Sequence, residues 1–212
     1  MNVESPLPAV AAVVRHAHPV VFIRHGETDW NVVKRLQGRT DIPLNERGRG
    51  QARRNGAAVR DHFAASNIAV EDFAFFASPL GRARETMEIV AAELGVDGAR
   101  IGFDARLVEI SFGDWEGNSM KDIEASRPHE VAPRKAAPFT HAPPNGESYA
   151  MLTERVAAFL AGVDGPAVIV SHGGVSRAVR GLLAGLPGEE IVHLPVPQDS
   201  FFFWENGEGR WL

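Results

Sequence analysis

A cation and a potential nucleophile follow the first apolar run of the chain. Residues Val20–Ile23 are typical of a buried strand, and Arg24-His25-Gly26 comes directly after them. Ligands of open α/β sheets bind in the crevice outside the carboxyl ends of such strands. There, a histidine ring nitrogen can attack phosphorus while the adjacent guanidinium holds phosphate oxygens. The alternative is a capping loop in which Arg24 and His25 only bond backbone carbonyls.

Two later apolar runs end in polar residues in the same way. Phe73–Ala77 leads into Ser78-Pro79-Leu80-Gly81-Arg82, and Ala167–Val170 leads into Ser171-His172-Gly173-Gly174. If the strands are parallel and adjacent, their carboxyl ends meet at one edge of the sheet. Packing alone does not explain why polar residues follow all of these apolar strands, so we expect one pocket at that edge of the sheet. It would contain Arg24, His25, Arg82 and His172.

Phosphoryl transfer also needs a proton donor for the leaving oxygen. Glu109 precedes the unusual string Ile110-Ser111-Phe112-Gly113-Asp114-Trp115-Glu116-Gly117. A carboxylic acid beside the pocket could protonate the leaving oxygen and then deprotonate an attacking water. The alternative is a solvent-exposed Glu109 and a Trp115 that only anchors the core.

The elements that must position these residues alternate as short apolar runs and amphipathic helices, which is typical of an α/β layered fold. Asn45 and Ser148 are suited to cap two of the helices. We expect helices at about residues 46–64, 82–94 and 174–183, another after Ser148, and further strands at Ile101–Phe103 and Phe201–Trp204. The predicted fold is a three-layer α/β/α arrangement with a mostly parallel central sheet.

The chain is expected to form a single domain, residues 19–212, after a disordered extension of residues 1–18. Between about residues 118 and 146 the periodic pattern gives way to proline- and alanine-rich sequence with short helical turns. We expect this segment to be a lid or rim of the site, because a strong core element follows it. The Phe201–Trp204 strand would present an apolar edge that could pair with a second copy and give a homodimer.

Composition argues against several classes of function. With 212 residues, 44% hydrophobic and 23% charged, the chain is typical of a globular protein. Its net charge of −5 argues against nucleic-acid binding, so an anionic substrate would need a local positive cleft. No run is long enough to span a membrane, and the lack of cysteine excludes disulfides and thiol chemistry. We expect a cytoplasmic protein.

Four separated motifs resemble the histidine phosphatase superfamily, in its phosphoglycerate mutase-like branch. They are Arg-His-Gly-Glu-Thr-x-Trp-Asn from Arg24, Ser-Pro-Leu-x-Arg-Ala from Ser78, Glu-x-x-Phe-Gly-x-Trp-Glu-Gly from Glu109, and Ser-His-Gly-Gly from Ser171. The resemblance runs from about Val20 to Arg180. It is specific because all the motifs occur in the order found in the family.

The resemblance implies a role for each matching residue. His25 matches the nucleophile that becomes a phosphohistidine. Arg24, Arg82 and His172 match the residues that hold the phosphoryl oxygens, and Glu109 matches the general acid and base. Substrate-binding positions are expected at Asn31, Gly173, Thr28 and Gly38. We expect no metal or nucleotide cofactor, because the sequence contains neither a phosphate-binding glycine loop nor a metal-ligand set. The partner would be a small phosphorylated metabolite.

Hydrolysis of a phosphomonoester is favoured over mutase activity. Mutases of the family carry a longer insert with an arginine pair, whereas Asn118–Pro144 is short here and its basic residues are scattered. These basic residues are Lys121, Arg127, Arg134 and Lys135. Pro144-Asn145-Gly146-Glu147-Ser148 also resembles a segment of the phosphatase members. A phosphoglycerate mutase is the alternative. A non-catalytic phospholigand-binding protein is less favoured, because His25 and Glu109 are both present.

Other residues are left open by the sequence. Arg35 and Arg39 could contact substrate or face solvent, whereas helical spacing from Arg82 places Arg84 outside the site. The aromatic residues that could form an apolar rim or belong to the core are Phe112, Trp115 and Phe139. His16 and His18 have a metal-like spacing, but no further ligand set accompanies them.

Overall fold

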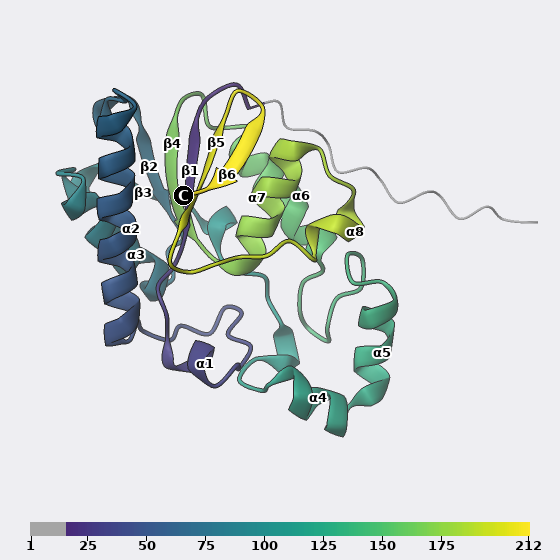
Figure 1. Ribbon diagram of the computed structural model, residues 1–212. Coiled ribbons are helices and arrows are strands. Elements are labelled where there is room, and N and C mark those ends of the chain that lie inside the picture. Colours follow the sequence, from purple (N-terminus) through teal and green to yellow (C-terminus); the bar gives the residue numbers. More distant parts are fainter. Residues whose placement is uncertain (1–15) are drawn as a thin grey trace, which may run out of the picture.

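The computed structural model describes residues 16–212, so most of the expected N-terminal extension lies outside the described residues. One sheet forms the centre of the molecule, with the strand order β3-β2-β4-β1-β5-β6 (Figure 1). The strands are β1 (Val20–Arg24), β2 (Ala74–Ala77), β3 (Ile101–Phe103), β4 (Ala167–Ser171), β5 (Phe201–Glu205) and β6 (Glu208–Trp211). In this part of the chain, no helix has the length and apolar character needed to cross a lipid bilayer.

Strands β1, β4 and β2 are parallel neighbours, as expected from the polar residues that follow each of them in the sequence. Arg24 at the end of β1 is level with Ser171 at the end of β4, and Ala77 of β2 is level with Val170. Their carboxyl ends therefore meet at one edge of the sheet, where a ligand crevice is expected.

Helices cover both faces of the sheet and confirm the expected three-layer α/β/α fold. Helices α2 (Glu46–Ala65) and α3 (Gly81–Glu93) lie on one face, and α6 (Tyr149–Leu160) and α7 (Gly173–Ala184) lie on the other (Figure 1). The predicted boundaries of α2, α3 and α7 are each within one residue of the observed ones.

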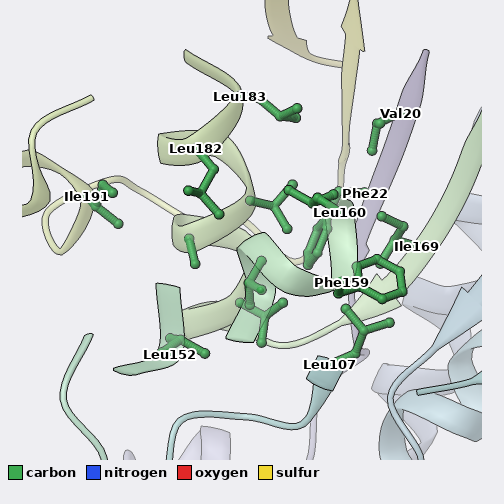
Figure 2. Packing of buried hydrophobic residues seen from close by; sticks show 14 of the residues in the cluster. Val20, Phe22, Leu107, Leu152, Phe159, Leu160, Ile169, Leu182, Leu183 and Ile191 are labelled. Carbon is green, nitrogen blue, oxygen red and sulfur yellow. The ribbon is translucent and has the colours of Figure 1, made fainter. Parts of the chain in front are cut away.

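The inner strands are buried on both faces, which explains their continuous apolar sequence. Val20 and Phe22 of β1 belong to the core beneath α6 and α7, whereas Val21 and Ile23 belong to the core beneath α2 and α3. Figure 2 shows the first of these cores, in which residues of α6 and α7 gather against the sheet. Alternate side chains of one strand thus tie the two helical layers together.

Helix ends follow the capping residues expected from the sequence. The side-chain oxygen of Asn45 accepts a hydrogen bond from the N–H of Gly48 at 2.9 Å, at the start of α2. Ser148 accepts one from the N–H of Met151 at 3.2 Å, at the start of α6. Each bond satisfies a backbone donor that the first turn of a helix leaves free.

The segment at residues 118–146 contains more regular structure than the sequence indicated. It forms two helices, α4 (Met120–Ser126) and α5 (Pro128–Ala136). Ser119 and Asp122 form a capping box at α4, and Pro128 occupies the first turn of α5, where its missing N–H costs nothing. A small core of Trp115, Ile123 and Val131 holds the two helices to the preceding loop.

The expected apolar edge at Phe201–Trp204 is wrong, because β6 covers it. The chain turns back at Asn206-Gly207, where φ is 53° and 83°, and β6 pairs antiparallel with β5. An Asn-Gly pair favours such a tight hairpin, so the sequence did contain this signal. The outer edge of the sheet is therefore the short and mostly exposed β6, which removes the reason given above for a homodimer.

The remaining elements are short. They are helices α1 (Asp29–Val32) and α8 (Gly188–Ile191), and 3-10 turns at Val70–Asp72, Gly98–Arg100, Ala105–Leu107 and Gly113–Trp115.

Neighbouring residues on α6 provide a test of the packing. Leu152 is completely buried in the core of Figure 2, whereas Met151 is 53% exposed. Leu152→Ala should lower the free energy of unfolding by about 2–5 kcal/mol, because it leaves a cavity. Met151→Ala should change it by less than about 0.5 kcal/mol. Urea unfolding measures both values, and equal losses would contradict this packing.

Candidate active site

A pocket of about 230 Å³ lies at the carboxyl ends of the parallel strands. It lies between the end of β1, the start of α7 and the loop that follows α1. The expected residues that line it are Arg24, His25, Asn31, Gly38, Arg82, Glu109 and Gly173. His172 is completely buried, and its ring meets that of His25 edge-on with centroids 5.1 Å apart. The structure thus brings together the residues that follow all three strands, β1, β2 and β4.

His25 lies at the pocket with one ring nitrogen occupied and the other free. Its Nδ1 is 2.7 Å from the carbonyl oxygen of Gly26. A carbonyl oxygen only accepts hydrogen bonds, so Nδ1 carries the ring proton and Nε2 keeps its lone pair. Burial, together with the charges of Arg82 and Arg24, holds the pKa of His25 well below its ordinary value. The ring is therefore a neutral base with an available nitrogen.

The backbone after His25 is held by close contact with α2. A Cβ atom on Gly26 would lie 2.2 Å from the carbonyl oxygen of Gly48, so only glycine fits at this position. The N–H of Gly26 donates to Oγ1 of Thr86 on α3 at 3.2 Å. These contacts fix the carbonyl that sets the tautomer of His25.

Arg82 is completely buried and is held mainly by backbone carbonyls. Its guanidinium donates to the carbonyl of Thr40 at 2.8 Å and to that of Gly38 at 2.7 Å. The carboxylate of the exposed Asp41 is 3.8 Å away. Because its charge is not paired with a buried carboxylate, it remains available to an anion in the pocket.

Glu116 holds the loop that supplies these carbonyls, a role that the sequence did not reveal. One carboxylate oxygen accepts from the hydroxyl of Thr40 at 2.7 Å and from its N–H at 3.1 Å. The other accepts from the N–H of Arg39 and of Phe112, each at 3.1 Å. Glu116 therefore joins the loop at Arg82 to the loop after Glu109.

His172 offers a second polar nitrogen next to His25. Its Nε2 is 2.7 Å from Oγ of Ser78, which also accepts from the N–H of Leu80 at 3.3 Å. When the hydroxyl of Ser78 donates its hydrogen to Nε2, the ring proton of His172 is on Nδ1. Within residues 16–212, this buried Nδ1 has no hydrogen-bond partner. Burial and the charge of Arg82 hold the pKa of His172 well below its ordinary value.

Glu109 lies at the N-terminus of α7. Its Oε1 accepts from the N–H of Ile110 at 2.9 Å and from that of Gly174 at 3.0 Å. A negative charge is favoured at a helix N-terminus. A Cβ on Gly174 would lie 2.5 Å from Oε1, so glycine is needed for this approach. Arg155, paired with Glu147 at 2.8 Å, donates to the backbone carbonyl of Glu109 and fixes it from behind.

Asn31 lines the pocket, but Thr28 does not. Thr28 is completely buried, and its Oγ1 accepts from the N–H of Asn31 at 3.3 Å as the cap of α1. The side-chain oxygen of Asn31 accepts from the N–H of Thr28 at 3.0 Å. In the part of the chain that the structure describes, the amino group of Asn31 has no partner, so it can donate into the pocket. Thr28 therefore positions Asn31 rather than contacting a substrate.

Two pocket residues were missed by the sequence analysis. Arg177 and Tyr149 line the pocket, and Arg177 donates to the hydroxyl of Tyr149 at 3.1 Å. Arg177 lies one helical turn beyond Gly173 and Gly174, and this spacing would have placed it on the same face of the helix.

The open arginines and aromatic residues are now placed. Arg35 lines the pocket, Arg39 lies 3.5 Å from Glu147, and Arg84 lies over the ring of Phe103 outside the pocket, as expected. Of the three aromatic residues that the sequence left open, Phe112 lines the pocket, whereas Trp115 and Phe139 are buried in the core.

With this geometry in place, a family comparison identifies the chain. The model of the histidine phosphatase superfamily (branch 1) matches residues 20–212. The chain belongs to this superfamily. Among curated members, the probable phosphoglycerate mutase GpmB of Citrobacter koseri is 33% identical over 198 residues, which is 91% of this chain and 87% of that protein.

Solved structures of the superfamily share the fold over nearly the full chain. The α-ribazole phosphatase of Shigella flexneri is 27% identical with a TM-score of 0.74, covering 92% of this chain and 94% of that one. A mycobacterial glucosyl-3-phosphoglycerate phosphatase in complex with VO3 is 30% identical with a TM-score of 0.74, covering 92% and 96%.

The pair His16 and His18 gains no further ligands in the structure. Their ring centroids are 5.9 Å apart. Between residues 16 and 212, the structure contains no group of three or more histidine, cysteine, aspartate or glutamate side chains that could hold a metal ion.

The lowered pKa values of His25 and His172 predict how stability depends on pH. Below pH 6.5 a histidine of the unfolded chain binds a proton, whereas the buried rings of His25 and His172 stay neutral. Proton binding therefore stabilises the unfolded state, and the free energy of unfolding decreases as the pH falls. Above pH 6.5 the effect vanishes. Between pH 6.5 and its lowered pKa, each ring should decrease the free energy of unfolding by up to about 1.4 kcal/mol for each unit by which the pH falls.

Urea unfolding between pH 8 and pH 5 measures this slope. His172→Asn should flatten it, whereas His129→Asn, at a histidine whose side chain is 79% exposed, should leave it as in the wild type. An unchanged slope in His172→Asn would show that His172 is not held neutral in the folded protein.

Proposed function

We propose that the protein hydrolyses phosphomonoesters through a phosphohistidine intermediate on His25. The observation that carries this proposal is the unprotonated Nε2 of His25 in a pocket lined by the guanidiniums of Arg24, Arg35, Arg82 and Arg177. A neutral imidazole beside fixed positive charge is suited to attack a phosphoryl group.

In the first step, Nε2 of His25 attacks phosphorus in line with the leaving oxygen. The N–P bond forms as the P–O bond breaks, and a proton carried by Glu109 passes to the leaving alcohol. Arg24, Arg82 and Nδ1–H of His172 face the negative phosphoryl oxygens, and the free amino group of Asn31 adds a further donor. Gly26 holds the proton on Nδ1 throughout.

In the second step, water attacks the phosphohistidine. The carboxylate of Glu109 takes a proton from this water, the N–P bond breaks, and inorganic phosphate leaves. His25 returns to the tautomer with its proton on Nδ1. The products are an alcohol and phosphate, and every proton in the cycle is carried by Glu109 or the solvent.

The placement of the scattered basic residues favours hydrolysis over isomerisation. Arg127 donates to the backbone of Asp114, Arg134 to that of His141, and Lys135 pairs with Glu124. These residues and Lys121 do not line the pocket, so the segment does not build a second phosphate site there. The phosphatases among the structural relatives agree with hydrolysis, whereas the GpmB relatives keep a mutase as the second candidate.

The partner we infer is a small phosphorylated metabolite, which a pocket of about 230 Å³ suits. Four expectations from the sequence stay predictions. They are that residues 118–146 form a rim of the site, that the chain is a single domain, that it forms a homodimer, and that it is located in the cytoplasm.

The direct test is phosphate release from p-nitrophenyl phosphate and 3-phosphoglycerate in the presence of EDTA. The wild type should release phosphate from a phosphomonoester, and His25→Ala should be inactive because it lacks the nucleophile. His129→Ala, at an exposed histidine outside the pocket, should retain full activity.

Adding 2,3-bisphosphoglycerate separates the candidate functions. Isomerisation of 3-phosphoglycerate faster than phosphate release would overturn the hydrolase in favour of the mutase. A wild-type protein that binds phosphate esters and turns none over would indicate a binding protein.

Glu109→Gln tests the proton donor through the leaving group. It should lower kcat/KM by about 100-fold or more for an alkyl phosphate, whose alkoxide must be protonated as it leaves. For p-nitrophenyl phosphate the loss should be smaller, because nitrophenolate leaves without a proton. Losses of equal size for the two esters would show that Glu109 is not the acid.

A further inference from the structure

A second cavity, of about 310 Å³, lies outside the pocket that contains His25. It lies between α4, α5 and the segment that follows α8 (Figure 1), and we call it the α5 cavity. Its lining residues are Met120, Val131, Arg134, Lys135, Pro138 and His193. None of these six residues lines the pocket at His25, so the proposed hydrolysis gives the α5 cavity no role.

One wall of the α5 cavity is apolar. Val131 is buried and belongs to the small core that joins α4 and α5, whereas the side chain of Met120 is 37% exposed although it is apolar. Pro138 adds a third apolar side chain. Such a wall suits the hydrocarbon part of a ligand, because the removal of apolar surface from water is favourable.

Arg134 brings a positive charge to this cavity without a carboxylate partner. Its Nη1 donates to the carbonyl of His141 at 2.9 Å, and its guanidinium lies 5.9 Å from the ring centre of Phe112. In the described part of the chain, no carboxylate lies within ion-pair distance of Arg134. Burial lowers the pKa of Arg134, because its charge is partly withdrawn from water. An anion in the cavity would compensate this loss of hydration.

The neighbouring carboxylates on α4 and α5 are used by other cations. Glu124 pairs with Lys135. Glu130 pairs with Arg127 at 3.7 Å. The charge of Arg134 is therefore left over, and it lies beside the apolar wall. A small carboxylate with an apolar body fits both features.

Residues 193–196 connect the α5 cavity to the pocket at the strand ends. His193 lines the cavity, and Val196 lines the pocket. The carbonyl of Val196 accepts a hydrogen bond from Arg24 at 3.3 Å, and that of Leu194 accepts one from Arg177 at 2.8 Å. A segment that forms part of the cavity thus orients two arginines of the pocket.

We propose that the α5 cavity is a regulatory site for a small carboxylate with an apolar body, which Arg134 binds and which residues 193–196 couple to the pocket at His25. A ligand that packs against His193 displaces this segment, together with the carbonyls that orient the two arginines. Its negative charge also reduces the positive potential around the pocket. Both effects weaken the binding of a phosphoryl group. The inference concerns binding rather than turnover, so it does not depend on hydrolysis.

Octanoate is the probe, because it joins one carboxylate to an apolar chain. Calorimetry should show saturable binding to the wild type, and Arg134→Gln should raise the Kd about tenfold or more because the charged partner is lost. Acetate and 1-octanol each lack one half of the probe and should bind more weakly. Octanoate that does not bind, or that binds no better than 1-octanol, would overturn the proposal.

Lys121→Gln is the matched control. Lys121 follows Met120 on α4 and is exposed, but it lines neither the α5 cavity nor the pocket at His25. This variant loses the same charge as Arg134→Gln and should bind octanoate as the wild type does. An equal loss of affinity in both variants would show that Arg134 does not bind the carboxylate.

Methyl NMR locates the ligand in the wild type without any substitution. Octanoate should shift the methyl signals of Met120 and Val131, which line the α5 cavity. Ile110 lines the pocket at the strand ends and serves as the internal reference. A shift of Ile110 without shifts of Met120 and Val131 would place octanoate in the other pocket and overturn the proposal.

The Kd for inorganic phosphate in the pocket at His25 tests the coupling. Saturating octanoate should raise this Kd about fivefold or more, to a constant limit. In Arg134→Gln, the same concentrations of octanoate should leave the Kd for phosphate unchanged. A Kd that keeps rising in proportion to octanoate would indicate direct competition, and an unchanged Kd in the wild type would overturn the coupling.

These measurements separate the inference from the proposed function, because none of them needs turnover. A protein that hydrolyses no phosphate ester and yet shows the expected effect of octanoate on phosphate binding would lack the proposed function and keep the regulatory site. A protein that hydrolyses esters and does not bind octanoate would keep the function and lack the site.

Discussion

The binding of Arg82 by backbone carbonyls is the interaction on which the rest of the site depends. A buried guanidinium paired with a buried carboxylate would have little charge left for a ligand. Here the carbonyls of Gly38 and Thr40 each accept a hydrogen bond from a terminal nitrogen of Arg82, at 2.7 and 2.8 Å. The charge therefore remains effective in the pocket. It favours a bound phosphoryl group, and it adds to the effect of burial, which is the main cause of the lowered pKa values of His25 and His172.

The motif around Trp115 is explained by the support that these carbonyls need. Trp115 is completely buried and its ring nitrogen donates to Glu130 of α5 at 2.7 Å, which ties α5 to the site. The next residue, Glu116, collects hydrogen bonds from the loop that holds Arg82 and from the loop that follows Glu109. The phosphoryl-binding side and the proton-donating side of the pocket are thus joined through a single carboxylate.

The sequence predicted the parts of this structure that depend on local pattern and on general rules of sheet topology. Parallel apolar strands with polar ends bring Arg24, Arg82 and His172 together whatever the details of packing. Strand β6 was missed because its four residues, with Gly209 among them, lack an apolar pattern, although the Asn206-Gly207 pair was a hairpin signal. Where α4 and α5 lie, the sequence predicted only short helical turns, because prolines obscured the periodic pattern.

The same holds for the residues of the site: those with a local signal in the sequence were predicted, and those placed by long-range contacts were not. His25 was predicted from its type and its place after a strand, and Glu109 from its place at the start of a motif that resembles the family's. The support by Glu116 could not be found, because its partners at Arg39 and Thr40 are more than seventy positions away in the chain. Thr28 was expected at the substrate, yet only the structure shows that its hydroxyl is used to cap α1.

The central claim is that Nε2 of His25 forms a bond to phosphorus. The most direct measurement is to quench the enzyme during turnover of a ³²P-labelled phosphomonoester, to locate the labelled residue by peptide mapping, and to assign the phosphorylated nitrogen by ³¹P NMR of the same intermediate made with unlabelled ester. The account predicts an acid-labile, alkali-stable label on Nε2 of His25, which is absent from His25→Ala. A label on Nδ1, a label on another residue, or turnover without any labelled enzyme would contradict it.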